Sequence, residues 1–174
     1  HQAVGKSILK RLSPGDAGRE SFLDSIRQTQ LILDGRVGRI RPMNCLESLA
    51  FREMLKVVDL RERPVEFQAT LLKKGNELRL IGDFYQPKGN SLGVQESRAA
   101  GSLRRKLQRQ GWELSAHLHN HPFSFEGGGD VGGTPAPSNA DVDLYLSERP
   151  KLGLVTNGFD TIELAPRDWR TLKR

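Results

Sequence analysis

The sequence predicts a mixed α/β (α+β) fold, and two observations favour that class. Runs of alternating apolar and polar residues, typical of strands, interleave with runs at helical spacing. The two kinds of segment follow no strict βαβ rhythm, so the class is mixed. No apolar run approaches the ~20 residues of a membrane-spanning helix. The 174 residues fit one domain with a modest extension, and we divide them into an N-terminal helical extension, residues 1–44, and a main domain, residues 45–174.

Two helices are expected in the first third of the chain. Residues 21–34 carry apolar side chains at roughly helical spacing, and Gly35 ends the segment. Asn44 stands three residues before Glu47, which is a capping-box pattern. This pattern opens a second helix that carries apolar residues as far as Val58. The apolar positions of the first helix are Phe22, Ile26, Leu31 and Leu33.

The middle of the chain predicts a hairpin, a helix and a strand. Residues 65–72 and 77–84 read as strands joined by a turn that contains Gly75 and Asn76. Residues 97–110 predict a polar, basic helix. Residues 112–121 alternate like a strand, which Pro122 ends.

The last part of the chain predicts a loop, a helix and a second hairpin. Residues 123–137 form an irregular, glycine-rich loop. A helix is expected at residues 139–148, before Pro150. Residues 152–156 and 161–164 then make a hairpin around an Asn-Gly pair.

Charge and cysteine content narrow the function classes. The net charge is +6 and the pI is about 9.8, yet the basic residues are scattered and no aromatic residues stand among them. A surface that stacks nucleic-acid bases needs such aromatic residues, so a solvated basic face is the preferred interpretation. Cys45 is the only cysteine, which excludes an internal disulfide and a cysteine-rich zinc finger. We expect a cytoplasmic protein, with a processed secreted form as the alternative.

Three of the four histidines lie on one expected strand, at His117, His119 and His121. Alternation places them on one face, where neighbours two apart are roughly 7 Å distant. His119 and His121 stand at the strand end and can converge on one metal ion. His117 lies deeper, and we interpret it as a packing residue or a support for the ligands. The structural alternative for all three is a face of satisfied core histidines.

A carboxylate completes the candidate metal set. Ser138 precedes the last long helix and Asp141 is its third residue, so the pair is also a variant of the capping box. Both interpretations are compatible, because a capped helix start presents Asp141 rigidly. Two imidazoles and one carboxylate leave one coordination position for water, which is typical of catalytic zinc. The residues therefore predict a Zn²⁺ hydrolase with the ligands His119, His121 and Asp141.

The segments His119-Asn120-His121-Pro122 and Ser138-Asn139-Ala140-Asp141 resemble the motif of the JAMM (JAB1/MPN/Mov34) zinc metalloproteases. The residues of these two segments are similar to those of the prokaryotic, RadC-like branch of the family. The resemblance covers roughly residues 45–164. Two features depart from the family. Asn120 stands where many members have Ser or Thr, and the stretch before Ser138 is longer.

The resemblance implies a central mixed β-sheet flanked by helices, the JAB/MPN-like, cytidine-deaminase-like architecture. It implies an isopeptidase or peptidase that cleaves after the C-terminus of ubiquitin or a ubiquitin-like protein. A glutamate on the strand after the first helix of the domain would be the general base. Glu66 occupies that place, with Glu62, Glu77 and Glu113 as rivals. Ser138 would bind the oxyanion, and the tail of the partner would add as a strand beside the site.

Three other functions remain open at this stage. The protein can be a zinc hydrolase of small peptides or amino acid adducts. It can be a non-enzymatic scaffold, although all three ligands are present. The basic charge and the RadC-like wording leave a nucleic-acid-associated protein as the third alternative.

Overall fold

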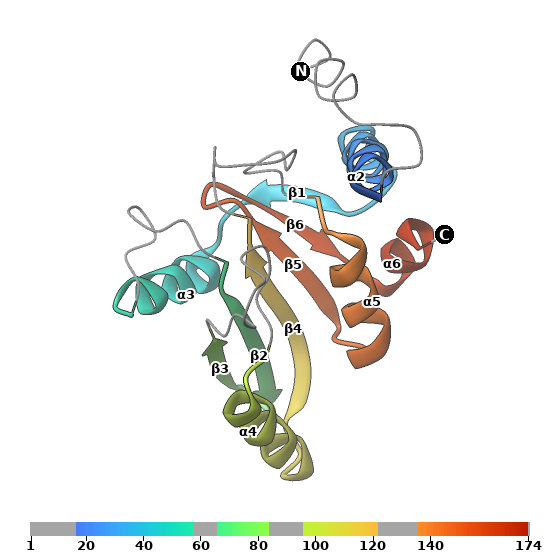
Figure 1. The fold of residues 1–174 in the computed structure, drawn as a ribbon. Coiled ribbons are helices and arrows are strands. Elements are labelled where there is room, and N and C mark those ends of the chain that lie inside the picture. Colours follow the sequence, from blue (N-terminus) through green and yellow to red (C-terminus); the bar gives the residue numbers. More distant parts are fainter. Residues whose placement is uncertain (1–16, 58–65, 84–95, 122–135, 174) are drawn as a thin grey trace.

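The computed structural model describes residues 17–57, 66–83, 96–121 and 136–173 (Figure 1). The predicted fold class is confirmed, because these residues form a six-stranded mixed β-sheet with five helices. The strand order is β1-β6-β5-β4-β2-β3. Only β4 and β5 pair in parallel within this sheet, and the other pairs are antiparallel. The strands are β1 (Arg39–Pro42), β2 (Gln68–Lys74), β3 (Glu77–Asp83), β4 (Glu113–Asn120), β5 (Leu152–Thr156) and β6 (Asp160–Leu164).

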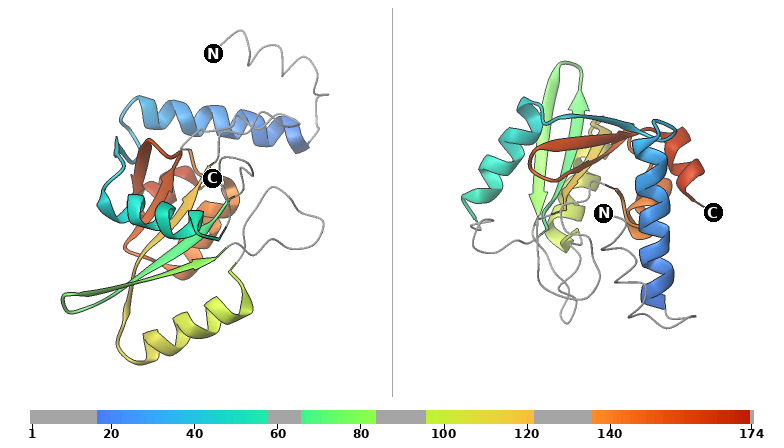
Figure 2. Two further views of the ribbon diagram at one scale, coloured as in Figure 1. Left: turned by 90° about the vertical axis from the view of Figure 1, so that its left-hand side faces the viewer. Right: turned by 90° about the horizontal axis from the view of Figure 1, so that it is seen from above.

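Helices cover both faces of the sheet (Figure 2). One face packs against α3, where Ala50 and Met54 join the buried residues of β2 and β4. The other face packs against α2, α5 and α6, around Tyr145 and Trp169. The helices are α2 (Ala17–Leu33), α3 (Cys45–Leu55), α4 (Arg98–Arg109), α5 (Asn139–Glu148) and α6 (Pro166–Leu172).

A β-bulge in β4 decides which face receives the histidines. The register shifts between Leu71, which pairs with Ala116, and Leu72, which pairs with Leu114. One extra residue on β4 therefore interrupts the alternation. Leu114 packs with α4, whereas Ala116 and Leu118 pack in the α3 core. The side chains of His117 and His119, which alternate with Ala116 and Leu118, consequently point to the face that α5 covers.

The predicted capping box at the start of α3 is confirmed, and it does more than cap the helix. Glu47 is fully buried, and both its carboxylate oxygens accept hydrogen bonds from Arg41, at 2.7 and 2.9 Å. Thr161 also donates to this carboxylate, and Arg41 donates to Glu163. The hydrogen bond to Glu47 raises the pKa of Arg41 further above its ordinary value. This network ties α3 to the edge strand β1 and to β6.

The structure differs from the sequence prediction at several elements. β1 and α6 were not predicted, and α3 ends at Leu55 rather than at Val58. Arg41 is half-buried in an ion pair with the buried Glu47, and does not lie on a solvated basic face. Among the α2 side chains that the structure describes, Ile26 and Leu33 are exposed and Gln28 and Ile32 are buried, and the predicted apolar side chain of Phe22 lies outside them.

The predicted 1–44 extension contributes to the main sheet, since β1 pairs with β6. Its Ile32 and Val37 also pack in the same core as Tyr145. The boundary at residue 44 stays a prediction. Within the described ranges, no helix has the length and apolar character needed to cross a membrane.

We expect Glu47→Ala to lower the free energy of unfolding by about 3 kcal/mol, because it removes the buried carboxylate that the half-buried Arg41 and the buried Thr161 both donate to. Glu53→Ala is the matched control, since Glu53 lies on the same helix but pairs with Lys56 at the surface. Urea titration followed by circular dichroism measures both variants. Equal midpoints for the two would contradict the structural role of Glu47.

Candidate metal centre

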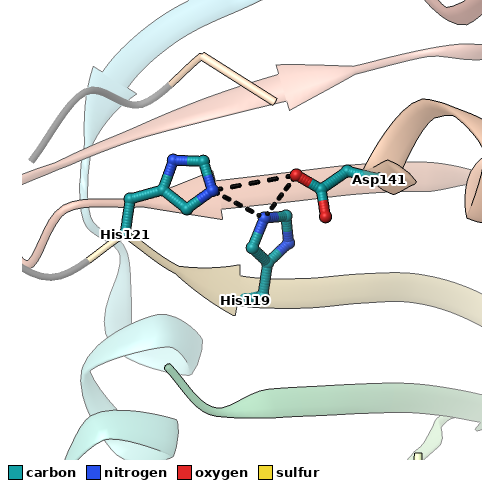
Figure 3. Close-up of side chains that lie close together, drawn as sticks. All are labelled: His119, His121 and Asp141. Atoms are coloured by element: carbon teal, nitrogen blue, oxygen red, sulfur yellow. Dashed lines mark hydrogen bonds and ion pairs between the residues drawn. The ribbon is translucent and has the colours of Figure 1, made fainter. Parts of the chain in front are cut away.

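Three side chains, from β4, from the residue directly after it and from α5, converge on one point in the structure (Figure 3). Asp141 Oδ2 lies 3.1 Å from His119 Nε2 and 3.7 Å from His121 Nε2. The two imidazole nitrogens are 3.1 Å apart. The sequence predicted this set, and the structure brings all three members together. The group can hold a metal ion through one nitrogen of each histidine and one carboxylate oxygen.

The sheet fixes the two histidines by pairing β4 on both sides. His119 stands opposite Gln68 of β2 and opposite Val155 of β5. His121 follows the end of β4, and its backbone N–H donates to Thr156 O at 2.8 Å. His119 is buried and His121 is half-buried, so the pair lies where the sheet core meets the surface.

The start of α5 fixes the carboxylate. The Asp141 backbone N–H donates to Ser138 Oγ at 3.1 Å, and the Ser138 backbone N–H donates to Asp141 Oδ2 at 2.6 Å. This is the capping box that the sequence predicted. The capping interaction and the metal set therefore use the same carboxylate, and they are compatible.

The electrostatics keep Asp141 ionised. Burial alone would raise the pKa of its carboxyl group, but the charge and hydrogen bonds of His119 and His121 outweigh it and hold the pKa well below its ordinary value. A carboxylate must be deprotonated to bind a metal ion. The cluster thus presents its acidic member in the form that coordination requires.

Sequence reasoning missed a contact that braces this helix start from outside. Gln28 of α2 is buried, and its Nε2 donates to Asn139 Oδ1 at 2.9 Å. Asn139 Nδ2 in turn donates to Asp24 at 3.2 Å. Asn139 directly follows Ser138, so α2 holds the backbone that carries the cap. The only sequence signal was a polar residue at a position of α2 that faces the core.

His117 lies outside the cluster of three. It is buried, its Nδ1 lies 3.4 Å from Thr70 Oγ1, and its Nε2 has no hydrogen-bond partner among the described residues. Burial, followed by the charge of Arg104, lowers the pKa of His117 to about 4. A neutral imidazole packed between strands agrees with the interpretation of His117 as a packing residue.

Glu66 is not a member of the cluster, and it lies just before β2, the strand that pairs with the histidine strand β4. It precedes β2, whose residue Gln68 pairs with His119. The neighbouring Phe67 N–H donates to the buried side chain of Asn120 at 2.7 Å. Asn120, the departure from the family motif, therefore anchors the backbone beside Glu66. The catalytic role of Glu66 stays a prediction.

The rival glutamates differ from Glu66 in their position. In the strand register, Glu77 stands opposite Lys74 and Glu113 stands opposite Lys73. Both positions are at the end of β2 that is far from Gln68. Six residues of strand separate Glu113 from His119, which corresponds to roughly 20 Å. Glu62 lies outside the described residues, as does the glycine-rich loop apart from Ala136 and Pro137.

Comparisons of the chain with protein-family models, with curated proteins and with solved structures find no match. The resemblance to the JAMM family therefore depends on the motif residues themselves, and the geometry of the site has to carry the functional argument.

We expect the chain to bind one zinc ion, and the His119→Ala, His121→Ala double variant to bind none, because two of three ligands are removed. Asp141→Ala should also lose it. His117→Gln is the matched control on the same strand and should keep the ion. Elemental analysis of the dialysed proteins gives the stoichiometry, and a full equivalent of zinc in the double variant would refute the assignment.

Proposed function

We propose that this protein is a zinc-dependent isopeptidase or peptidase that hydrolyses the bond after the C-terminus of a ubiquitin-like protein. The observation that carries the proposal is the triangle formed by His119, His121 and Asp141. The substrate class is inferred from the resemblance of the residues around this triangle to the JAMM motif.

The dimensions of the triangle fit zinc. Two atoms bound to one zinc ion at about 2.0–2.1 Å with a tetrahedral angle lie about 3.3 Å apart. The three edges here are 3.1, 3.1 and 3.7 Å. Structural zinc sites usually use four protein ligands, often thiolates, whereas this set has three and the only cysteine, Cys45, lies on α3. The donor set therefore fits a catalytic zinc with one position for water.

A zinc ion held by these residues supplies Lewis acidity that activates a water molecule at neutral pH. Glu66 would accept the proton of the attacking water and deliver it to the leaving amine. Its position at the site end of β2 supports this role, because Glu77 and Glu113 lie at the other end of the sheet. The Asn120 anchor on Phe67 supports it further, since a base needs a fixed backbone.

Ser138 would donate a hydrogen bond to the oxyanion. Its Oγ accepts the helix-capping bond from Asp141, so the hydroxyl proton is available to donate elsewhere. Ser138 is exposed and its neighbour in the cap is the metal ligand Asp141. An oxyanion that forms on the substrate at the metal would therefore lie near this hydroxyl.

The sheet offers an edge for an extended substrate tail. β3 is an edge strand, and its Asp83 pairs with Gln68, which pairs with His119 on the next strand. Two strand spacings of about 4.8 Å separate this edge from the histidine strand. A tail added along the side of β3 that pairs with no other strand among the described residues would run past the end of the sheet that carries the candidate metal centre.

The proposed function is tested with a panel of zinc-loaded reactions. The substrates are ubiquitin-like proteins fused through their C-terminus to a reporter, and short peptides of the same terminal sequence. We expect cleavage of at least one fusion, at its junction, by mass spectrometry. Cleavage of the short peptides alone would replace the proposal with a hydrolase of small peptides.

We expect Glu66→Gln to keep the fold and the zinc but to lose turnover by about 10²–10⁴-fold, because the amide cannot accept the proton. Glu77→Gln and Glu113→Gln are the controls and should retain activity. If Glu66→Gln cleaves normally while either control is inactive, the base has been assigned to the wrong residue.

We expect Ser138→Gly to lower kcat by about 10²–10³-fold through loss of the hydroxyl donor. Glycine is chosen because it costs a helix N-cap only a few tenths of a kcal/mol. The zinc content and thermal midpoint should therefore stay close to those of the unsubstituted protein. Ser138→Thr keeps the hydroxyl and should retain most of the activity, and equal losses in both variants would argue against oxyanion binding.

A further inference from the structure

Tyr145 is a fully buried side chain of α5 that reaches the metal centre from behind. It follows Asp141 by four residues, so both side chains project from the same side of the helix. Its Oη lies 3.5 Å from His119 Nδ1. His119 is thus contacted at both ring nitrogens, by Asp141 and His121 at Nε2 and by Tyr145 at Nδ1.

This arrangement has a consequence for the histidine tautomer. A metal ion bound through Nε2 requires the lone pair of that nitrogen, so the ring proton must be on Nδ1. A buried N–H needs an acceptor, and the Tyr145 oxygen stands at the required side of the ring. Ligating histidines generally have such a partner on the second nitrogen. The hydroxyl therefore favours the tautomer and the ring orientation that let His119 bind a metal ion.

Gly153 of β5 makes the space for the tyrosine ring. A Cβ atom at this position would lie 2.5 Å from both Cε2 and Cζ of Tyr145, closer than side-chain atoms pack. Gly153 stands opposite His117, two residues before the partner of His119 on β5. Any larger residue at position 153 would therefore push the tyrosine ring away from the sheet, and its hydroxyl away from His119.

The other side of the ring is closed by α6. The Trp169 ring packs on Tyr145 with centroids 5.5 Å apart. β5 on one side and α6 on the other therefore hold the ring, and with it the hydroxyl, in one place.

We propose that Tyr145 is a positioning residue that orients His119 for metal binding through its hydroxyl group, and that Gly153 is the seat of its ring. The inference rests on the metal centre of the proposed function, but it does not depend on the substrate. The competing interpretation is that Tyr145 is an ordinary core residue whose ring alone matters.

Tyr145→Phe separates these interpretations, because it keeps the ring and removes only the oxygen. The probe is zinc, titrated in competition with a chelating dye. We expect a zinc Kd about 10-fold weaker than in the unsubstituted protein, the lower end of the range for such supporting residues. The thermal midpoint of the metal-free variant should change little. Trp169→Phe is the control, since it alters packing against the same ring without touching His119.

A second readout follows the imidazole itself. In zinc-loaded protein labelled with ¹⁵N histidine, the Nδ1–H of His119 should be protected from solvent exchange, and Tyr145→Phe should abolish that protection. Gly153→Ala should also weaken zinc binding, and by a smaller factor when Phe already stands at position 145, because the two changes act on one hydroxyl.

The outcomes are distinct. An unchanged zinc Kd with an unchanged His119 signal in Tyr145→Phe overturns the inference, and fully additive effects overturn the role of Gly153. A protein that binds zinc and shows the tyrosine effect but cleaves no ubiquitin-like fusion supports the inference and refutes the proposed function. A protein that binds no zinc overturns both.

Discussion

The first backbone N–H groups of a helix need acceptors from outside the helical hydrogen-bond ladder, and α5 meets this need with the side chain that also faces the two histidines. Asp141 Oδ2 accepts from the Ser138 N–H and lies beside both Nε2 atoms. Its position is therefore set by helix formation. His119 is set by strand pairing on either side of β4, and His121, the next residue after the strand, by the hydrogen bond from its N–H to Thr156 O. The candidate metal centre lies where two regular elements, each stable for its own reasons, are packed together. Each candidate ligand lies in or directly beside one of these elements, which is a rigid way to place it.

The sequence predicted local features well and long-range ones poorly. Both capping boxes and the bounds of α5 and β5 follow from residues within a few positions of each other, and the structure has them as expected. β1 has only four residues and is a strand because β6 lies beside it. α6 carries a Pro at its start, which is a helix signal, but its seven residues are too few for a periodic pattern. The bulge in β4 is invisible in a pattern of alternation, yet it determines which residues of that strand share a core.

The candidate site shows the same division. His119, His121 and Asp141 could be predicted because strand alternation and a helix start constrain them within two short segments. The brace from Gln28 to Asn139 joins residues 111 positions apart, and nothing in either segment indicates the other. Tyr145 had a detectable signal, since it stands one helical turn after Asp141. Its significance depends on Gly153, however, and a glycine in a strand does not reveal which ring it accommodates.

The parallel pairing of β4 and β5 requires a crossover, and α5 belongs to it. His121 stands where the chain leaves β4, and Asp141 stands on the helix of the crossover, so an ion held by both acts as a crosslink across the intervening segment. The entropic cost of closing a flexible segment grows only slowly with its length, by about 0.6 kcal/mol for each doubling. Residues between the two ligands can thus be inserted, removed or exchanged at little cost to the centre. Under the proposed function, the chain beside the ion could change, and with it the choice of substrate, while the ligands stay the same.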